Sequence, residues 1–359
     1  MKLRKSITAA AVVLLVAAGA AYVFRAQLAM AVAMRVAAQK LGADGAATLP
    51  DGLHVGLCGA GSPFPDEKRG GPCTLVIAGK RQFVFDAGSG ASRNIGKMGF
   101  NQGAVDAIFL SHFHSDHIDG LGELMLQRWV SNSNREPVPV YGPPGVERVL
   151  MGFMMAYGQD QHYRVAHHGD ATVPASGFGG RAMPFAVEPT GHTVVFKEGD
   201  LEIDAFQVDH SPVHPAVGFR ISYKDRTLVL SGDTKKSAAV QREAQGVDLL
   251  VHEALSIPLV QGLQSVAGQV GRANLQKIFG DIIDYHATPE QAAQTARDAK
   301  VGYLLLNHIV PTLPGLPGLE KAFVGDAASI YGGTIQVGAD GDFVSLPVGS
   351  KAINVSRRF

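Results

Sequence analysis

The stretch Ser111-His112-Phe113-His114-Ser115-Asp116-His117 follows directly on the apolar run Ala107 to Leu110. A continuous apolar run of this kind is expected for a short strand that is buried on both faces. Since side chains alternate along an extended chain, the first two histidines point the same way, and the aspartate and the last histidine reach a second position as the chain turns. Imidazole and carboxylate ligands without thiolate suit zinc, or iron or manganese. The spacing therefore favours a metal site over a polar loop with incidental histidines.

The composition is that of a folded globular protein with an even charge balance. The chain has 359 residues, of which 46% are hydrophobic and 18% are charged, and this excludes a disordered or fibrous protein. Lysine plus arginine and aspartate plus glutamate both number 32, so no charge excess attracts the whole chain to nucleic acid. With 43 glycines and 19 prolines, we expect many turns and short strands rather than a helical bundle. Two cysteines are too few for a disulfide-built scaffold or a thiolate zinc site.

Two series of strands organise the chain beyond its N-terminal segment. Short strands separated by glycine-rich turns are expected from Leu53 to Phe85, and a second series from Val194 to Val251. In each half, helical segments follow the strands, which predicts a pair of sheets sandwiched between helices. We therefore expect one α/β catalytic domain over residues 46–359, with an insertion at about residues 127–190.

The N-terminal segment, residues 1–45, has the pattern of an export signal or a membrane anchor. Basic residues at positions 2, 4 and 5 precede an uncharged run from Ser6 to Phe24, and its 19 residues approach the roughly 20 that a helix needs to cross hydrocarbon. Residues 25–40 continue as an amphipathic stretch, so we favour an uncleaved transmembrane anchor over a cleaved signal; a buried soluble helix is the third alternative. Either of the first two would place the rest of the chain in the cell envelope, anchored to the inner membrane and facing the periplasm, or secreted into the periplasm.

The motif His-x-His-x-Asp-His at residues 112–117 resembles the metal-binding motif of the metallo-β-lactamase superfamily, whose fold is an αββα sandwich of two mixed β-sheets. Four more residues match the family in order and context: Asp86, His210, Asp233 and His308. The resemblance covers Leu53 to His308, and it implies a metal-dependent hydrolase. The family's di-iron oxygen-reducing branch has a glutamate at the place of His114, so a hydrolytic site is favoured here.

The resemblance implies two zinc ions per chain, with Mn²⁺ or Fe²⁺ as alternatives. Seven residues would hold them. The first ion would be bound by His112, His114 and His210, and the second by Asp116, His117 and His308. Asp233 would bind both ions. In the family a hydroxide that bridges the metals attacks the substrate, so no serine or cysteine nucleophile is needed. Asp116 and the bridging aspartate would orient the attacking water, and Asp86 matches a residue that orients one of the ligands.

Three further segments resemble the ribonuclease Z-like and metallo-arylsulfatase-like branch of the superfamily: residues 57–72, His252-Glu253-Ala254 and Tyr285-His286-Ala287-Thr288. In ribonuclease Z-like enzymes, the histidine at the place of His286 is a candidate proton donor to the leaving oxygen, a role that suits a histidine. A helix-capping turn residue is the alternative for His286. The resemblance places His252 and Glu253 behind the metal ligands, where we expect a buried histidine that is hydrogen-bonded with Glu253.

The expected substrate is a small-molecule ester, either a phosphoester or phosphodiester or an aryl sulfate. Ribonuclease Z enzymes that bind tRNA carry a long flexible arm between the lone histidine and the bridging aspartate, whereas His210 and Asp233 are only 23 positions apart. The neutral net charge and the exported topology also argue against tRNA, so we expect no stable nucleic-acid partner. A β-lactam or lactone hydrolase on the same site is the alternative. A non-catalytic zinc-binding protein is disfavoured because all seven ligand positions are filled.

Substrate contacts are expected from the insertion and from the loop after His210. Trp129, Tyr157 and Tyr163 would form a roof that suits an apolar or aryl substrate, unless they pack as the insertion's own small core. His214 would be a contact on the substrate side. The sequence leaves the oligomeric state open, with a homodimer as one alternative.

Cys58 and Cys73 lie at the end of the first expected strand and the start of the second. We favour two buried thiols that act as small apolar residues. A disulfide is the alternative if the two α-carbons lie within roughly 7 Å of each other in an oxidising compartment.

Overall fold

The structure is a computed structural model that describes residues 2–41 and 44–359, apart from the side chains of residues 2–5, 8, 9, 40 and 41. The chain divides into two compact units, Met1–Asp44 and Gly45–Phe359. The first unit holds α1 (Lys2–Val23) and α2 (Arg25–Leu41). The basic side chains at positions 2, 4 and 5, on which the predicted export signal depends, lie outside the described residues.

The N-terminal helices leave the anchor prediction untested. Within the described part of the chain, no single helix is both long and apolar enough to cross a membrane. The segments Ala10–Val23 and Arg25–Gln39 together satisfy the length and composition of a span, but they are bent by 71° relative to each other. The transmembrane or signal helix therefore stays a prediction.

The second unit is built on two mixed β-sheets, and the first of them has eight strands in the order β15-β14-β1-β2-β3-β4-β5-β6. From β15 to β3 the neighbours are antiparallel, and from β3 to β6 they are parallel. The strands are β1 (Gly52–Gly59), β2 (Cys73–Ala78), β3 (Arg81–Phe85), β4 (Val105–Phe109), β5 (Val138–Gly142), β6 (Gly180–Pro184), β14 (Asp342–Pro347) and β15 (Asn354–Arg357).

The other sheet has seven strands in the order β13-β12-β11-β10-β9-β8-β7. Neighbours are antiparallel from β7 to β10 and parallel from β10 to β13. The strands are β7 (His192–Glu198), β8 (Leu201–Gln207), β9 (Val217–Tyr223), β10 (Arg226–Leu230), β11 (Leu249–Leu255), β12 (Tyr303–Val310) and β13 (Thr334–Val337).

An apolar core joins the two sheets face to face. Phe85 and Phe109 of the first sheet stack with ring centroids 4.9 Å apart, and Phe219 of the second sheet meets Phe85 edge-on at 5.1 Å. All three side chains are buried, and the burial of each contributes roughly 1.5–3 kcal/mol to folding. Because Phe85 and Phe109 end β3 and β4, this packing fixes the points at which both strands pass into the polar loops.

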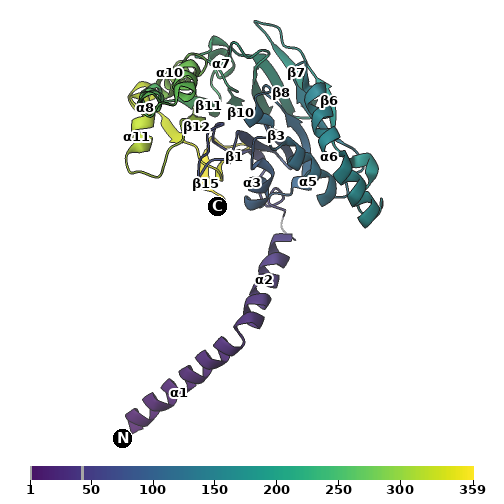
Figure 1. The fold of residues 1–359 in the computed structure, drawn as a ribbon, viewed down its shortest axis with the longest axis vertical. Helices are drawn as coiled ribbons and strands as arrows, with labels where there is room; N and C mark the ends of the chain where they lie inside the picture. Colours follow the sequence, from purple (N-terminus) through teal and green to yellow (C-terminus); the bar gives the residue numbers. More distant parts are fainter. Residues whose placement is uncertain (1, 42–43) are drawn as a thin grey trace. The chain divides into compact units, whose positions relative to one another are not determined.

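Helices cover the outer face of each sheet and complete the αββα arrangement (Figure 1). The first sheet packs against α3 (Ala91–Lys97), α5 (Leu121–Ser131) and α6 (Val146–His168). The second packs against α7 (Ala238–Glu243), α10 (Pro289–Asp298), α11 (Leu319–Val324) and α12 (Ala327–Tyr331). The other α-helices of this unit are α4 (Ser115–Ile118), α8 (Ile257–Gln269) and α9 (Ala273–Asp281). The predicted α/β sandwich of two mixed sheets is confirmed.

Strand direction brings the polar loops of each sheet to one edge. Because β3 and β4 are parallel, Asp86 after β3 and Ser111 after β4 emerge side by side. On the second sheet β10, β11 and β12 are parallel, so Asp233 after β10 emerges beside the carboxyl ends of β11 and β12. His308 lies near the end of β12. The fold thus gathers the candidate ligands from distant parts of the sequence.

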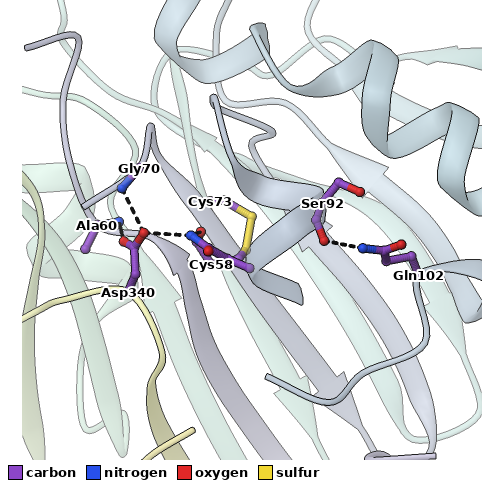
Figure 2. The surroundings of a disulfide bond; sticks show 8 residues. Cys58, Ala60, Gly70, Cys73, Ser92, Gln102 and Asp340 are labelled. Carbon is purple, nitrogen blue, oxygen red and sulfur yellow. Dashed lines mark hydrogen bonds between the residues drawn. A yellow bond between two sulfur atoms is a disulfide. The ribbon is translucent and has the colours of Figure 1, made fainter. Parts of the chain in front are cut away.

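Cys58 and Cys73 form a disulfide between β1 and β2, with their α-carbons 4.9 Å apart (Figure 2). The interpretation as two free thiols is therefore wrong. The β1–β2 register pairs Gly59 with Cys73 and has an irregularity between Leu57 and Gly59, which brings Cys58 within reach of Cys73. Beside the disulfide, the buried Asp340 carboxylate accepts hydrogen bonds from the backbone N–H groups of Ala60 and Gly70, at 2.9 and 2.8 Å (Figure 2). The disulfide and the two hydrogen bonds to Asp340 together hold the loop between β1 and β2.

Candidate metal centre

Asp86 fixes the backbone from which the histidine motif begins. Its φ angle of 56° lies in the left-handed region, which aspartate tolerates better than most residues. The carboxylate accepts the backbone N–H of Ser111 at 2.8 Å, the hydroxyl of Ser111 at 2.8 Å and Nδ1–H of His117 at 2.9 Å. These contacts place Asp86 next to His117, and its role in orienting a metal ligand stays a prediction.

The same contacts define which ring nitrogen of two histidines faces the centre. His117 donates from Nδ1 to Asp86, so its Nε2 faces the centre. Although burial lowers it, the charges of Asp233 and Asp86 raise the pKa of His117 well above its usual range, so a metal ion would replace a proton at Nε2. The Ser111 hydroxyl gives its hydrogen to Asp86, so Nδ1 of His112, at 3.0 Å, must donate to the Ser111 oxygen. Nε2 of His112 then keeps its lone pair. A metal ligand needs a free lone pair on one nitrogen, and a hydrogen bond from the other nitrogen orients the ring.

His112, His114 and His210 converge as the first group of candidate ligands. Nδ1 of His114 lies 3.0 Å from Nε2 of His112 and 3.4 Å from Nε2 of His210. His210 donates from Nδ1 to the backbone carbonyl of Tyr285 at 2.9 Å, which again leaves Nε2 free. Burial holds the pKa of His112 well below its usual range and lowers the pKa of His210 to about 4. These imidazoles are therefore neutral at physiological pH, as metal ligands must be.

Asp116, His117 and His308 converge as the second group. Nε2 of His308 lies 3.2 Å from Oδ2 of Asp116, and Nε2 of His117 lies 3.7 Å from the same oxygen. His308 has a φ of 45°, an uncommon backbone conformation that lies next to the irregularity in the β11–β12 register. Although burial lowers it, the charges of Asp233 and Asp116 raise the pKa of His308 to about 8. The carboxylates around His308 therefore favour a positive charge at its Nε2, either a proton or a metal ion.

Asp233 lies between the two groups. Its Oδ2 is 3.2 Å from Nε2 of both His117 and His308, 3.9 Å from Nε2 of His112 and 3.8 Å from Nε2 of His210. Although burial raises it, the neighbouring imidazoles of His308 and His117 hold the pKa of Asp233 well below its usual range. One ionised oxygen thus faces ring nitrogens of both groups.

The seven residues fit metal ions by the chemistry of their facing atoms. Nε2 of His117 is buried and makes no hydrogen bond to any described residue. Nε2 of His112 and Nδ1 of His114 lie 3.0 Å apart, so both nitrogens face one point at which a proton or a metal cation would lie between them. Nitrogen and oxygen donors without sulfur suit zinc, manganese or iron. The structure thus brings all seven predicted ligands together, and their role as metal ligands stays a prediction.

His286 and Glu253 form a buried pair beside the ligands. Nδ1 of His286 donates to Oε1 of Glu253 at 2.9 Å, and the same oxygen accepts the backbone N–H of Thr234 at 2.9 Å. The His286 ring lies 5.2 Å from that of His210 and 5.3 Å from that of His308, measured between centroids. Burial lowers the pKa of His286 to about 4, so this residue is neutral at pH 7. The role of His286 as a proton donor and the role of Glu253 behind the ligands stay predictions.

His252 does not lie behind the ligands in the way that we expected. It is buried and donates from Nδ1 to the backbone carbonyl of Glu253 at 2.7 Å, which confirms the predicted burial and bond. However, Leu250 and Ala254 on the same face of β11 pack in the helix-covered cluster of the second sheet. Because side chains alternate along a strand, His252 points to that helix-covered face, and Glu253 points to the centre. The predicted role of His252 beside the metals is therefore wrong.

The predicted aromatic roof is not present as a unit. Trp129 has no exposed surface, its Nε1 donates to the carbonyl of Pro174 at 2.6 Å and its ring meets Phe178 edge-on. Trp129 therefore packs in the core of the insertion, as the alternative stated, and it is not a substrate contact. Tyr157 packs on α5, since a β-carbon added at Gly122 would lie 2.5 Å from its ring.

Two other predicted contacts stay predictions. Tyr163 is 61% exposed on α6. His214 is exposed in the loop after His210, and it lines a pocket together with Gln207 and Val217.

Two residues of the centre were not identified from the sequence. Ser111 connects Asp86 to His112 through its hydroxyl, and Tyr285 orients His210 through its backbone carbonyl. The position of Ser111, between a buried strand and the first histidine of the motif, indicates a residue close to the metal ligands. A backbone carbonyl leaves no signal in the sequence, because every residue type carries one.

Comparison with known proteins identifies the family. Residues 81–309 match the family described as "Beta-lactamase superfamily domain". A protein named Ribonuclease Z from Mycolicibacterium gilvum is 38% identical over 290 residues, which cover 80% of this chain and 94% of that protein. Another Ribonuclease Z, from Mycobacterium bovis, is 36% identical over 290 residues and covers 80% of this chain and 96% of that protein.

Solved structures show the same fold. The short form of human tRNase Z matches with a TM-score of 0.58 at 20% identity, over 82% of this chain and 100% of that one. The metallo-β-lactamase fold protein YhfI from Bacillus subtilis matches with a TM-score of 0.57 at 20% identity, over 82% and 100%. The chain therefore belongs to the metallo-β-lactamase superfamily, in its ribonuclease Z-like branch, and is a metal-dependent hydrolase of ester bonds.

Proposed function

We propose that this protein hydrolyses phosphodiester bonds at a centre of two zinc ions. The observation that carries the proposal is the position of Asp233, whose Oδ2 lies within 3.9 Å of ring nitrogens from both ligand groups. The likeness to proteins named Ribonuclease Z supports a phosphodiester rather than an aryl sulfate. Manganese or iron is compatible with the same donors.

In this proposal each group of ligands binds one zinc ion, and Asp233 binds both. His112, His114 and His210 would hold one ion, and Asp116, His117 and His308 the other, with Asp233 shared. When bound, the two ions supply Lewis-acid activation of a water molecule and neutralise charge on the phosphoryl oxygens. The hydrogen bonds to Asp86 and to the Tyr285 carbonyl orient the rings of His117 and His210, so that Nε2 of each faces the centre.

The chain's own residues orient the water and move the proton. Asp116 is ionised, because His308 and His117 hold its pKa below the usual range although burial raises it, so its carboxylate accepts a hydrogen bond from water. His286 donates from Nδ1 to Glu253 and carries its lone pair on Nε2. Since its pKa is about 4, His286 must first accept a proton at Nε2 before it gives that proton to the leaving oxygen. Glu253 accepts the hydrogen bond from Nδ1 and keeps the ring of His286 in this orientation throughout.

The name of the relatives weighs against our expectation that no nucleic acid binds. The proposal is limited to the bond that is cleaved, and a precursor tRNA belongs among the substrates to be tested beside small phosphodiesters. The full chain, loaded with zinc, should hydrolyse bis(4-nitrophenyl) phosphate much faster than 4-nitrophenyl sulfate or a chromogenic β-lactam. Replacement of a proposed ligand, His112→Ala, should abolish this turnover and lower the zinc content. The matched control His167→Ala changes an exposed histidine at the end of α6 and should alter neither.

Faster turnover of the sulfate or the β-lactam would contradict the phosphodiester assignment while the metal centre stood. Turnover that survives His112→Ala would contradict the centre itself.

We propose further that residues 1–44 hold the chain at a membrane of the cell envelope. The bent pair of segments with the length and composition of a span supports this. So does the Cys58–Cys73 disulfide, since disulfides persist in oxidising compartments. The full chain should float with lipid vesicles in a density gradient, and a chain without residues 1–44 should stay in the aqueous fraction. Equal distribution of the two would contradict the proposal.

A further inference from the structure

A second pocket opens at the same edge of the fold as the metal centre. The parallel strands β5 and β6 end there, and their carboxyl ends pass into Pro143 and Pro144 and into the segment Phe185–Val187. From the second sheet, β8 ends at Gln207, just before the loop that carries His210. These segments line a pocket of about 460 Å³, which is within the range of small-molecule binding sites.

Two contacts join the walls of this pocket to the metal-binding motif. The backbone N–H of Val217, a lining residue, donates to the carbonyl of Ser111 at 3.0 Å. The turn at Pro143 and Pro144 lies on the ring of Phe113, because a β-carbon added at the following Gly145 would be 3.1 Å from that ring. The pocket and the motif thus share a wall on each sheet.

The lining of the pocket is apolar and uncharged. Gln207 and His214 are the polar residues among those described around it, and the others are proline, alanine, valine and phenylalanine. Phe185 is held in place by the buried Phe219, with ring centroids 6.3 Å apart. No lysine or arginine in the described lining would attract a phosphate, and RNA binding depends on such cations. The pocket is therefore suited to an uncharged, apolar group.

We propose that this pocket binds an apolar substituent, an aryl or branched alkyl group, of the ester that is hydrolysed at the metal centre. The inference rests on the proposed function and adds the substrate class: phosphodiesters that carry one apolar group next to the reacting phosphorus. Burial of that group against Phe185 and Val187 supplies the binding energy, and the shared wall at Val217 and Ser111 places the phosphoryl group beside the ligands.

The first experiment measures binding without turnover. Zinc-loaded full chain is titrated in a calorimeter with phenylphosphonate and with methylphosphonate, which differ only in the apolar group. We expect phenylphosphonate to bind about tenfold to a hundredfold more tightly, from the discrimination that apolar pockets reach. The variant Ala186→Trp fills the pocket from an exposed position and should bring this ratio close to one. Ala186→Asp, which adds a charge instead of bulk, should lower the ratio as well.

A matched control comes from the other apolar pocket, of about 580 Å³, between α6 and β6. Ala175 is an exposed alanine in its lining, so Ala175→Trp adds the same bulk away from the motif and should keep the wild-type ratio. The second experiment compares kcat/KM for the phenyl and methyl diesters of 4-nitrophenyl phosphate in the same proteins. The preference for the phenyl diester should be of similar size and should be lost in Ala186→Trp.

The outcomes separate the pocket from the reaction. Equal binding of the two phosphonates to the wild type would refute the proposal that this pocket binds the apolar substituent. A preference for phenylphosphonate that Ala186→Trp retains would refute it as well. A binding preference that Ala186→Trp removes, with no diester turned over by any protein, would support the pocket and refute the proposed function.

Discussion

Asp86 gives the most specific prediction, because one carboxylate supports both the backbone of the motif and a ligand. Asp86→Asn keeps the shape and tolerates the left-handed backbone at φ 56°. Whichever way the new amide turns, its NH₂ group faces a buried donor, either the backbone N–H of Ser111 or the Nδ1–H of His117. An unsatisfied buried donor costs about 1–3 kcal/mol, so the unfolding free energy should fall by about that amount.

The substitution should also weaken metal binding. The negative charge behind His117 is lost in either orientation of the amide, and loss of such a partner lowers metal affinity by about 10- to 100-fold. This corresponds to roughly 1.4–2.7 kcal/mol. Competition with a chromophoric chelator measures the affinity of each zinc, and denaturant unfolding measures the stability.

The matched control is Asp106→Asn. Asp106 is a partly exposed carboxylate on β4 that accepts the backbone N–H of Gln82 at 2.8 Å and pairs with Arg81 at 2.9 Å. The Asp106→Asn variant should have a lower unfolding free energy than the wild type and the same zinc affinity. Zinc affinities of Asp86→Asn within about threefold of wild type for both ions would refute the role assigned to Asp86.

Four further predictions test other parts of the structure. Cys58→Ser with Cys73→Ser opens a loop with a sequence separation of 15 and should lower the unfolding free energy by about 3 kcal/mol in denaturant titrations under oxidising conditions; an unchanged value would show that the bridge does not form. Zinc affinity should fall as the pH drops below about 8, because protons compete for His308, and calorimetry in two buffers should detect the proton release; an affinity that is constant from pH 6 to 9 would contradict this. The same raised pKa should stabilise the metal-free protein below the unfolded value of about 6.5, with the contribution lost as the pH rises through about 8. Trp129→Phe should lower the melting temperature and leave KM unchanged, because Trp129 is buried; a raised KM with unchanged stability would restore it as a substrate contact.

The sequence predicted the two series of strands and the histidine motif, because both are local patterns of residues. A buried strand followed by His-x-His-x-Asp-His needs only strand alternation and the preferences of zinc to suggest a metal site. His210, Asp233 and His308 are isolated residues, and they were identified by their resemblance to a family pattern. Asp233 and His308 meet because β10, β11 and β12 are parallel, and His210 joins them because β8 runs in the same direction as β10.

The errors arose where the sequence left the packing direction undetermined. A tryptophan in an insertion can roof a site or fill a core, and the hydrogen bond from Trp129 to the Pro174 carbonyl decided for the core. His252 and Glu253 are adjacent, so on a strand only one of them can face the centre, and the resemblance did not say which. The disulfide depended on a distance of 4.9 Å between the α-carbons of Cys58 and Cys73, which follows from the irregular β1–β2 register.

The zinc content of three proteins tests the central claim most directly. Wild type, His210→Ala and His308→Ala are dialysed against zinc, and the metal is counted per chain by mass spectrometry. Since His210 and His308 belong to different ligand groups that share Asp233, the wild type should hold about two zinc ions and each variant about one. A single zinc in the wild type, or two in both variants, would contradict the two-metal centre.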